Sequence, residues 1–241
     1  MSKLKNSIQD EFLSTVSHEM RTPLTSIRGF SQTLLNSWDK IDDENKKKFI
    51  KIIEEQSNRL INLVENILTV SKEKSGNQIL TKIDVNSSIK KIIPMFVERY
   101  NNHKFIVNFD KNIPPALLDE DKFQQVMTNL IDNAGKYSPE GSSITVSTET
   151  GDDKIFVKVK DEGIGIKEED FEKLFKKFSR LENHLTSKTQ GNGLGLYITK
   201  QLVENMKGII SVKSRENAGS TFEVCFPIYT EEEALKCSQK S

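Results

Sequence analysis

A histidine with a carboxylate beside it, His18 followed by Glu19, lies near the start of the 241-residue chain. Glycines recur far downstream, in the strings DEGIG (161–165) and GNGLGL (191–196). The first pair offers an imidazole nucleophile with a neighbour that can orient it, and the second offers backbone N–H groups that can hold phosphate. Together they predict transfer of a phosphoryl group from ATP onto the chain's own histidine. A single His-Glu pair on a helix is more often just solvated, so the prediction depends on its surroundings.

The residues around His18 resemble the H-box of the sensor histidine kinases of two-component systems. They read FLSTVSHEMRTPL over 12–24, and only Met20 replaces the more usual leucine, which conserves volume. The resemblance implies that His18 is the phosphoacceptor and that an aspartate of a response regulator receives the group next. Glu19 can orient the imidazole and take up its proton. Thr22, one turn after His18, either positions a water for dephosphorylation of the regulator or is simply small enough to precede a proline.

Residues 3–75 contain one proline and one glycine, which predicts two long helices with a break at 36–41. In the second helix, apolar residues alternate spacings of four and three, the seam of a helical bundle. A lone hairpin has too little core, so we expect a second copy to complete a four-helix bundle in a homodimer. Packing on the rest of the chain is the alternative. Pro23 is expected to bend the first helix just past His18, either as a hinge or as a kink without a role.

Helix and strand patterns alternate over 78–230, which predicts an α/β sandwich with helices on one face of a sheet. The predicted fold class is therefore α+β. A helical hairpin over 1–77 serves dimerisation and phosphotransfer, and an ATP-binding sandwich follows over 78–230. By the resemblance, this sandwich is of the Bergerat (GHKL) type. The last residues, 231–241, are expected to form a disordered tail.

Two asparagines of the middle predicted helix of this domain, Asn129 and Asn133, are four residues apart and share a helical face. Lys136 and Tyr137 follow at the helix end. Amide oxygens and a cation suit magnesium-bound triphosphate, although polar helix faces can also be simply solvated. The string resembles the N-box of histidine kinases, which implies that Asn133 ligates Mg²⁺ and that the other three residues lie near the phosphates and ribose. Gly135 departs from the bulkier residue common there and predicts a looser helix end, since glycine costs about 1 kcal/mol against alanine.

The first glycine string ends an alternating strand, where Gly163 and Gly165 let the backbone approach a flat ligand closely. Asp161 is placed to accept a hydrogen bond from an adenine amino group. The pattern is weak alone, but it resembles the G1 box of the ATPase superfamily that includes DNA gyrase B and MutL. The second string opens a helix, where N–H groups cradle phosphate, and resembles the G2 box. Its predicted ATP-binding residues are Gly191, Gly193, Leu194, Gly195 and Leu196.

Between the two glycine strings, four apolar residues from Phe171 to Phe178 fall at helical spacing. Core packing is the simplest interpretation. The segment also resembles the F-box of the family, which implies that Arg180 reaches the γ-phosphate. The polar stretch 181–190 resembles the lid that closes over ATP.

Charge and cysteine content argue against a nucleic-acid-binding protein, a cysteine metal site and a disulfide-rich protein. Lys plus Arg equals Asp plus Glu at 35 each, so the chain has no net positive charge that would attract nucleic acid. Cys225 and Cys237 form neither a metal motif nor a disulfide framework, which fits a reducing compartment. No run of 18 apolar residues occurs. We expect a cytosolic protein, or the cytosolic part of a sensor whose membrane segments lie outside this chain.

Two other functions compete with the histidine kinase. One is an ATP-driven clamp of the gyrase B and MutL type, which hydrolyses ATP without phosphorylating itself. The H-box, the F-box and the lid sequence argue against it. The other is a scaffold with a dead nucleotide site, and the presence of every expected polar group argues against that.

Overall fold

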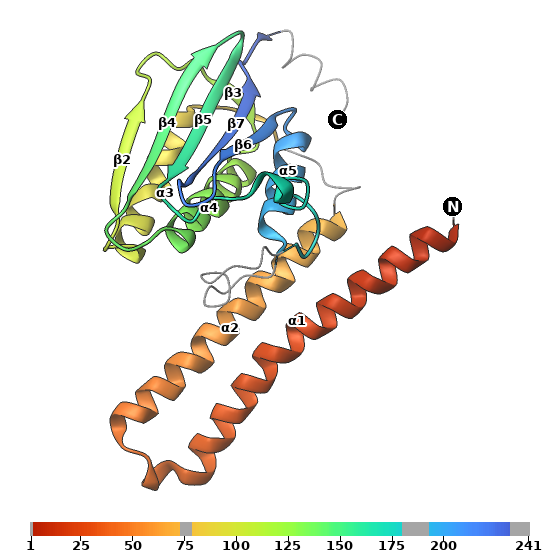
Figure 1. The fold of residues 1–241 in the computed structure, drawn as a ribbon, viewed down its shortest axis with the longest axis vertical. Helices are drawn as coiled ribbons and strands as arrows, with labels where there is room; N and C mark the ends of the chain where they lie inside the picture. The colour runs from red at the N-terminus through yellow and green to blue at the C-terminus, as the bar shows by residue number, and fades with distance from the viewer. Residues whose placement is uncertain (1, 73–78, 180–192, 232–241) are drawn as a thin grey trace. The chain divides into compact units, whose positions relative to one another are not determined.

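The computed structural model describes residues 2–72, 79–179 and 193–231 (Figure 1). These residues form two compact units that meet in sequence after Lys72, and each unit is described by itself. Arg180, the stretch 181–190, Gly191 and all but the first residue of the predicted tail lie outside the described residues.

The first unit is a helical hairpin. Its elements are α1 (Ser2–Ser37), the 3₁₀ turn η1 (Trp38–Lys40) and α2 (Asp43–Lys72). The predicted break between the two helices is confirmed. Asp42 caps α2 by accepting a hydrogen bond from the backbone N–H of Asn45 at 2.9 Å. Helix α1 runs through Pro23, and the expected bend there stays a prediction.

Few side chains described in the hairpin are buried: Pro23, Leu34, Gln56 and Leu63. The rings of Phe30 and Phe49 pack across the two helices, 5.1 Å apart. Large apolar side chains on both helices stay 39–82% exposed, namely Leu24, Leu35, Ile50, Ile61, Val64 and Leu68. One hairpin therefore leaves unburied an apolar surface whose burial is favourable by about 25 cal/mol per Å².

The second unit has one layer of sheet and one layer of helices (Figure 1). Its five-stranded sheet has the order β2–β4–β5–β7–β6, and only the β2–β4 pair is parallel. The strands are β2 (Lys104–Phe109), β4 (Ser143–Gly151), β5 (Lys154–Asp161), β6 (Ile209–Ser214) and β7 (Ser220–Pro227). The helices are α3 (Val85–Arg99), α4 (Glu120–Tyr137) and α5 (Gly195–Asn205). A small second sheet pairs β1 (Thr81–Ile83) with β3 (Ala116–Leu118).

The core of this unit lies between the sheet and its helices. Ile155, Val157 and Val159 alternate along β5 as buried residues, so one face of the strand is covered. The ring of Phe123 on α4 meets that of Phe226 on β7 edge to face, with centroids 5.7 Å apart. The predicted α/β sandwich is therefore confirmed.

The segment with helical spacing between the glycine strings is not an α-helix. After the 3₁₀ turn η2 (Glu168–Asp170), successive turns run from Phe171 to Phe178. Their backbone bonds join residues three apart, as in Leu174 N–H to Phe171 O at 3.3 Å. Of the four apolar residues only Leu174 is buried, at 7% exposure, and the other three are half-buried. The core-packing interpretation therefore holds for Leu174 alone.

Candidate functional site

His18 is exposed on α1, and its neighbour Glu19 makes an ion pair across the hairpin. The Glu19 Oε2 atom lies 3.2 Å from Nη2 of Arg59 on α2, and each side chain is 23% exposed. Arg59 was not identified from the sequence, because 40 residues separate it from Glu19. The pair fixes the Glu19 carboxylate against α2 while the imidazole beside it stays accessible.

Thr22 is also exposed, one turn after His18 on the same face. Its hydroxyl donates a long hydrogen bond, 3.5 Å, to the backbone oxygen of His18. Bonds of this kind occur commonly for threonine inside helices. A hydroxyl held this weakly can turn toward another partner.

In the second unit, α4 positions the two asparagines. Asp119 caps the helix by accepting from Lys122 N–H at 3.2 Å, and the apolar face of α4 packs into the core. Asn129 Nδ2 lies 3.3 Å from the hydroxyl of Thr199 on α5. The Asn133 amide is half-buried and makes no side-chain hydrogen bond within the described part of the chain. Asn129 thus joins α4 to α5, and Asn133 keeps a free amide oxygen.

Lys136 does not stand alone at the end of α4, because its ammonium is paired with Asp132 one turn earlier. Asp132 also accepts from Arg99 Nη1 at 3.1 Å and from the Tyr100 hydroxyl at 2.7 Å. Burial alone would raise the pKa of Asp132, but Lys136, Tyr100 and Arg99 outweigh it and hold that pKa below its usual value. Burial, and then the Asp132 charge, raise the pKa of Tyr100.

Gly135 has a packing role that its spacing did not reveal. A Cβ atom there would lie 2.6 Å from the ring of Tyr100, so only glycine lets this ring rest on α4. The ring and the ion pair of Lys136 hold the last turn of the helix. The expectation that this helix end is loose stays a prediction, and these two contacts oppose it.

Asp161 ends β5 with a side chain that is nearly fully buried. Its Oδ1 atom accepts from the backbone N–H groups of Gly163 at 2.8 Å and Ser220 at 3.1 Å. No hydrogen bond from the described residues reaches the other oxygen. Burial raises the pKa of this carboxyl, and the two N–H groups oppose the shift. The carboxyl is thus fixed with one oxygen left for a ligand, and Ser220 is a support that the sequence did not reveal.

The loop after Asp161 needs glycine at two positions. A Cβ at Gly163 would lie 2.4 Å from the backbone oxygen of Tyr137, and one at Gly165, where φ is +66°, would lie 1.9 Å from that of Arg215. Ile164 N–H donates to the Tyr137 oxygen at 3.1 Å. The loop therefore joins the end of α4 to the turn between β6 and β7.

The second glycine string leads into α5. Gly193 has a φ of +68°, and Leu194 is fully buried just before the helix. Gly195 begins α5 with open space around its Cα, and Leu196 is half-buried. The second glycine string therefore leads directly into the N-terminus of α5, and the phosphate cradle expected there stays a prediction.

Hydrogen bonds within the second unit connect the elements that carry the described members of the predicted nucleotide site. The Asn129–Thr199 and Tyr137–Ile164 hydrogen bonds connect α4 with α5 and with the loop after β5. His18, Glu19 and Thr22 belong to the first unit. In the described ranges, no three His, Cys, Asp or Glu side chains gather as a metal site, and no helix is long and apolar enough to cross a membrane.

Two family models match the chain, one for each unit. Residues 8–76 match the His Kinase A (phospho-acceptor) domain. Residues 118–230 match the histidine kinase-, DNA gyrase B- and HSP90-like ATPase. The second match implies that the chain uses ATP.

Known proteins give the same assignment. Sensor histidine kinase WalK of Bacillus subtilis is 36% identical over 232 residues, which is 92% of this chain but 37% of WalK, so the chain spans well under half of this relative. The histidine kinase AdeS of Acinetobacter baumannii has a TM-score of 0.71 at 27% identity, over 88% of this chain and 98% of that one. The histidine kinase ThkA, solved in complex with response regulator protein TrrA, has a TM-score of 0.72 at 30% identity, over 94% and 64%. With a phosphoacceptor hairpin followed by this ATPase fold, the chain belongs to the sensor histidine kinases of two-component systems.

Proposed function

We propose that the chain is an ATP-dependent protein histidine kinase that phosphorylates itself on His18 and then passes the phosphoryl group to an aspartate of a response regulator. One observation carries the proposal: an exposed histidine beside an anchored carboxylate stands in the same chain as a converging set of nucleotide-binding groups. WalK, AdeS and ThkA, named as histidine kinases, support it. The complex of ThkA with TrrA supports the choice of a response regulator as acceptor.

ATP would bind through groups from three segments. The free oxygen of Asp161 accepts from the adenine amino group, and the N-terminus of α5 faces the phosphates. Lys136, Asn129 and Tyr137 lie near the phosphates and ribose. Gly163, Gly165, Gly193, Leu194 and Leu196 shape the surrounding backbone, while Arg180 and Gly191 keep their proposed roles from the family resemblance alone.

Asn133 would hold Mg²⁺ through its free amide oxygen. A single neutral oxygen fits this ion, because magnesium in kinase sites takes most of its remaining ligands from phosphates and water. When bound, the ion neutralises developing charge on the phosphates.

The transfer step needs positioning more than covalent help. A neutral imidazole nitrogen of His18 attacks the γ-phosphorus, the bond from that phosphorus to the bridging oxygen breaks, and ADP leaves. Glu19 orients the ring and accepts its proton. Because Arg59 holds Glu19 in place, the carboxylate meets the ring from a fixed direction. The resulting N–P bond then passes its phosphoryl group to a carboxylate.

A homodimer would complete the first unit. The exposed apolar side chains of the hairpin suit a second copy, giving the dimeric four-helix bundle on which the regulator docks. We assign residues 1–77 to dimerisation and phosphotransfer, 78–230 to catalysis and 231–241 to a tail. Thr22 would support dephosphorylation of the regulator by orienting water. Cysteine usage supports a cytosolic site of action.

Incubation of the full chain with γ-labelled ATP and Mg²⁺ tests the proposal against its two competitors. A histidine kinase acquires protein label that is acid-labile and base-stable. A clamp releases ADP and phosphate without labelling itself, and a dead scaffold does neither. Either of the last two results would contradict the proposed function.

A further inference from the structure

Asp132 is a half-buried carboxylate that the proposed reaction does not use. Its side chain is 17% exposed and precedes Asn133 directly on α4. Three donors converge on it: Lys136 from its own helix, Arg99 at the end of α3, and the hydroxyl of Tyr100 just after α3. A carboxylate placed beside the proposed phosphate site adds a negative charge where an anionic ligand must come.

Lys136 stands between two faces of α4. At roughly 100° per residue, its side chain lies between that of Asp132, four residues earlier, and that of Asn133, three residues earlier. The structure pairs it with Asp132, yet its side chain is 35% exposed, so the ammonium can turn to a ligand at the asparagine face. Asp132 and a phosphate are thus alternative partners for one cation.

We propose that Asp132 is a positioning residue that competes with nucleotide phosphates for Lys136 and so sets the affinity for phosphate-bearing nucleotides. The inference rests on the proposed ATP site. An unpaired carboxylate inside a protein is unfavourable. Arg99 and the Tyr100 hydroxyl still donate to Asp132 when Lys136 turns away, so the interior tolerates the exchange.

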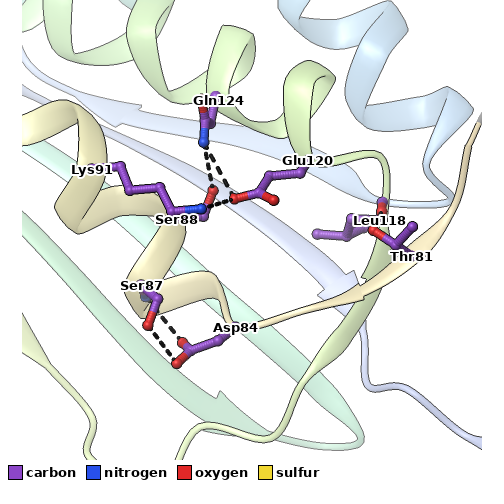
Figure 2. Close-up of polar contacts among 8 residues, drawn as sticks. All are labelled: Thr81, Asp84, Ser87, Ser88, Lys91, Leu118, Glu120 and Gln124. Atoms are coloured by element: carbon purple, nitrogen blue, oxygen red, sulfur yellow. Dashed lines mark hydrogen bonds and ion pairs between the residues drawn. The ribbon is translucent and has the colours of Figure 1, made fainter.

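Asp132 also joins α3 to α4. A control variant is therefore needed that breaks a contact between these helices without affecting phosphate binding. A second ion pair joins the same helices at the start of α4, where Lys91 Nζ lies 2.7 Å from Glu120 Oε1 (Figure 2). Ser88 and Gln124 extend that cluster. Glu120 lies twelve residues before Asp132, or about 18 Å along the helix. Glu120→Gln is therefore a matched control that breaks an α3–α4 pair far from the asparagines.

The experiment measures the dissociation constants of ATP and of adenosine, both with Mg²⁺, for variants of the full chain. Asp132→Asn frees Lys136 and should tighten ATP about two- to fivefold, the size of a partly exposed ion pair. Adenosine, which has no phosphate, should bind as to the unmodified chain. Glu120→Gln should leave both constants unchanged. In the Lys136→Met background, Asp132→Asn should change the ATP constant less than about twofold, because its partner is gone.

Arg99→Ala is expected to change the ATP affinity in the opposite direction. This variant tests the proposal if Asp132→Asn fails to fold. Losing Arg99 makes Asp132 depend more on Lys136, so ATP should bind more weakly, by up to about twofold for a pair this exposed. The proposal is overturned if the unmodified chain binds ATP but Asp132→Asn binds it no more tightly, or if adenosine shifts equally. It is overturned too if Arg99→Ala tightens ATP. Absence of ATP binding to the unmodified chain would instead refute the proposed function itself.

Discussion

At Asp161, the stability of the fold and the proposed binding of adenine make opposite demands on one carboxyl group. Its folded pKa is raised above the ordinary value of 3.8, so the folded chain holds that proton more tightly than the unfolded chain. The contribution of Asp161 to the free energy of unfolding is therefore greatest below pH 3.8 and is lost as the pH rises through the folded pKa. At higher pH, burial of this carboxyl therefore costs stability, while its second oxygen is the one proposed to bind adenine.

Asp161→Asn should consequently raise the melting temperature at pH 7 and weaken ATP binding. The amide oxygen can still accept from Gly163 and Ser220, while its NH₂ group faces the adenine amino group as a second donor. A mismatch of this kind weakens binding by roughly tenfold or more. Thermal melts from pH 3.5 to 8 and titrations with ATP check both effects. Equal melting temperatures at pH 7, or unchanged ATP affinity, would contradict this assignment.

At the scale of elements, the end of α4 is fixed by packing against the Tyr100 ring. Gly135→Ala improves helix propensity by about 1 kcal/mol. The new Cβ meets the Tyr100 ring at 2.6–2.8 Å, and overpacking costs about 1–3 kcal/mol, so we expect a net loss of stability. Urea unfolding measures the change, and the double variant Gly135→Ala, Tyr100→Leu should recover part of it. A single variant more stable than the unmodified chain would show that the ring moves aside freely.

Local spacing predicted the elements that carry the site. Asn129 and Asn133 do share one face of α4, and the second glycine string does open α5, because these relations lie within a few residues. Contacts between distant segments were not predictable, and this is why Arg59 and Ser220 were missed. Strands β1 and β3 have three residues each, too few for a periodicity. The F-box spacing is shared by α-helices and tight turns, so it indicated the wrong element.

At the scale of the whole molecule, the apolar side chains left exposed on the hairpin predict self-association. Ile61→Glu places a charge in the middle of the exposed stripe that includes Val64 and Leu68, and burying that charge in a bundle is strongly unfavourable. We expect the variant to be monomeric at micromolar concentrations where the unmodified chain is dimeric, by light scattering. Glu55→Lys, an exposed change on the same helix, is the control and should stay dimeric. A dimeric Ile61→Glu would place the interface elsewhere.

Phosphorylation of His18 is the step on which the proposed function depends. The chain has two other histidines, His103 and His184, so each can be tested in turn. The most direct measurement is labelling of the full chain with γ-labelled ATP and Mg²⁺, compared with His18→Gln and with ATP affinity measured on both. We expect acid-labile label on the unmodified chain, no label on His18→Gln, and equal ATP affinity for both. Label that persists on His18→Gln would contradict this expectation.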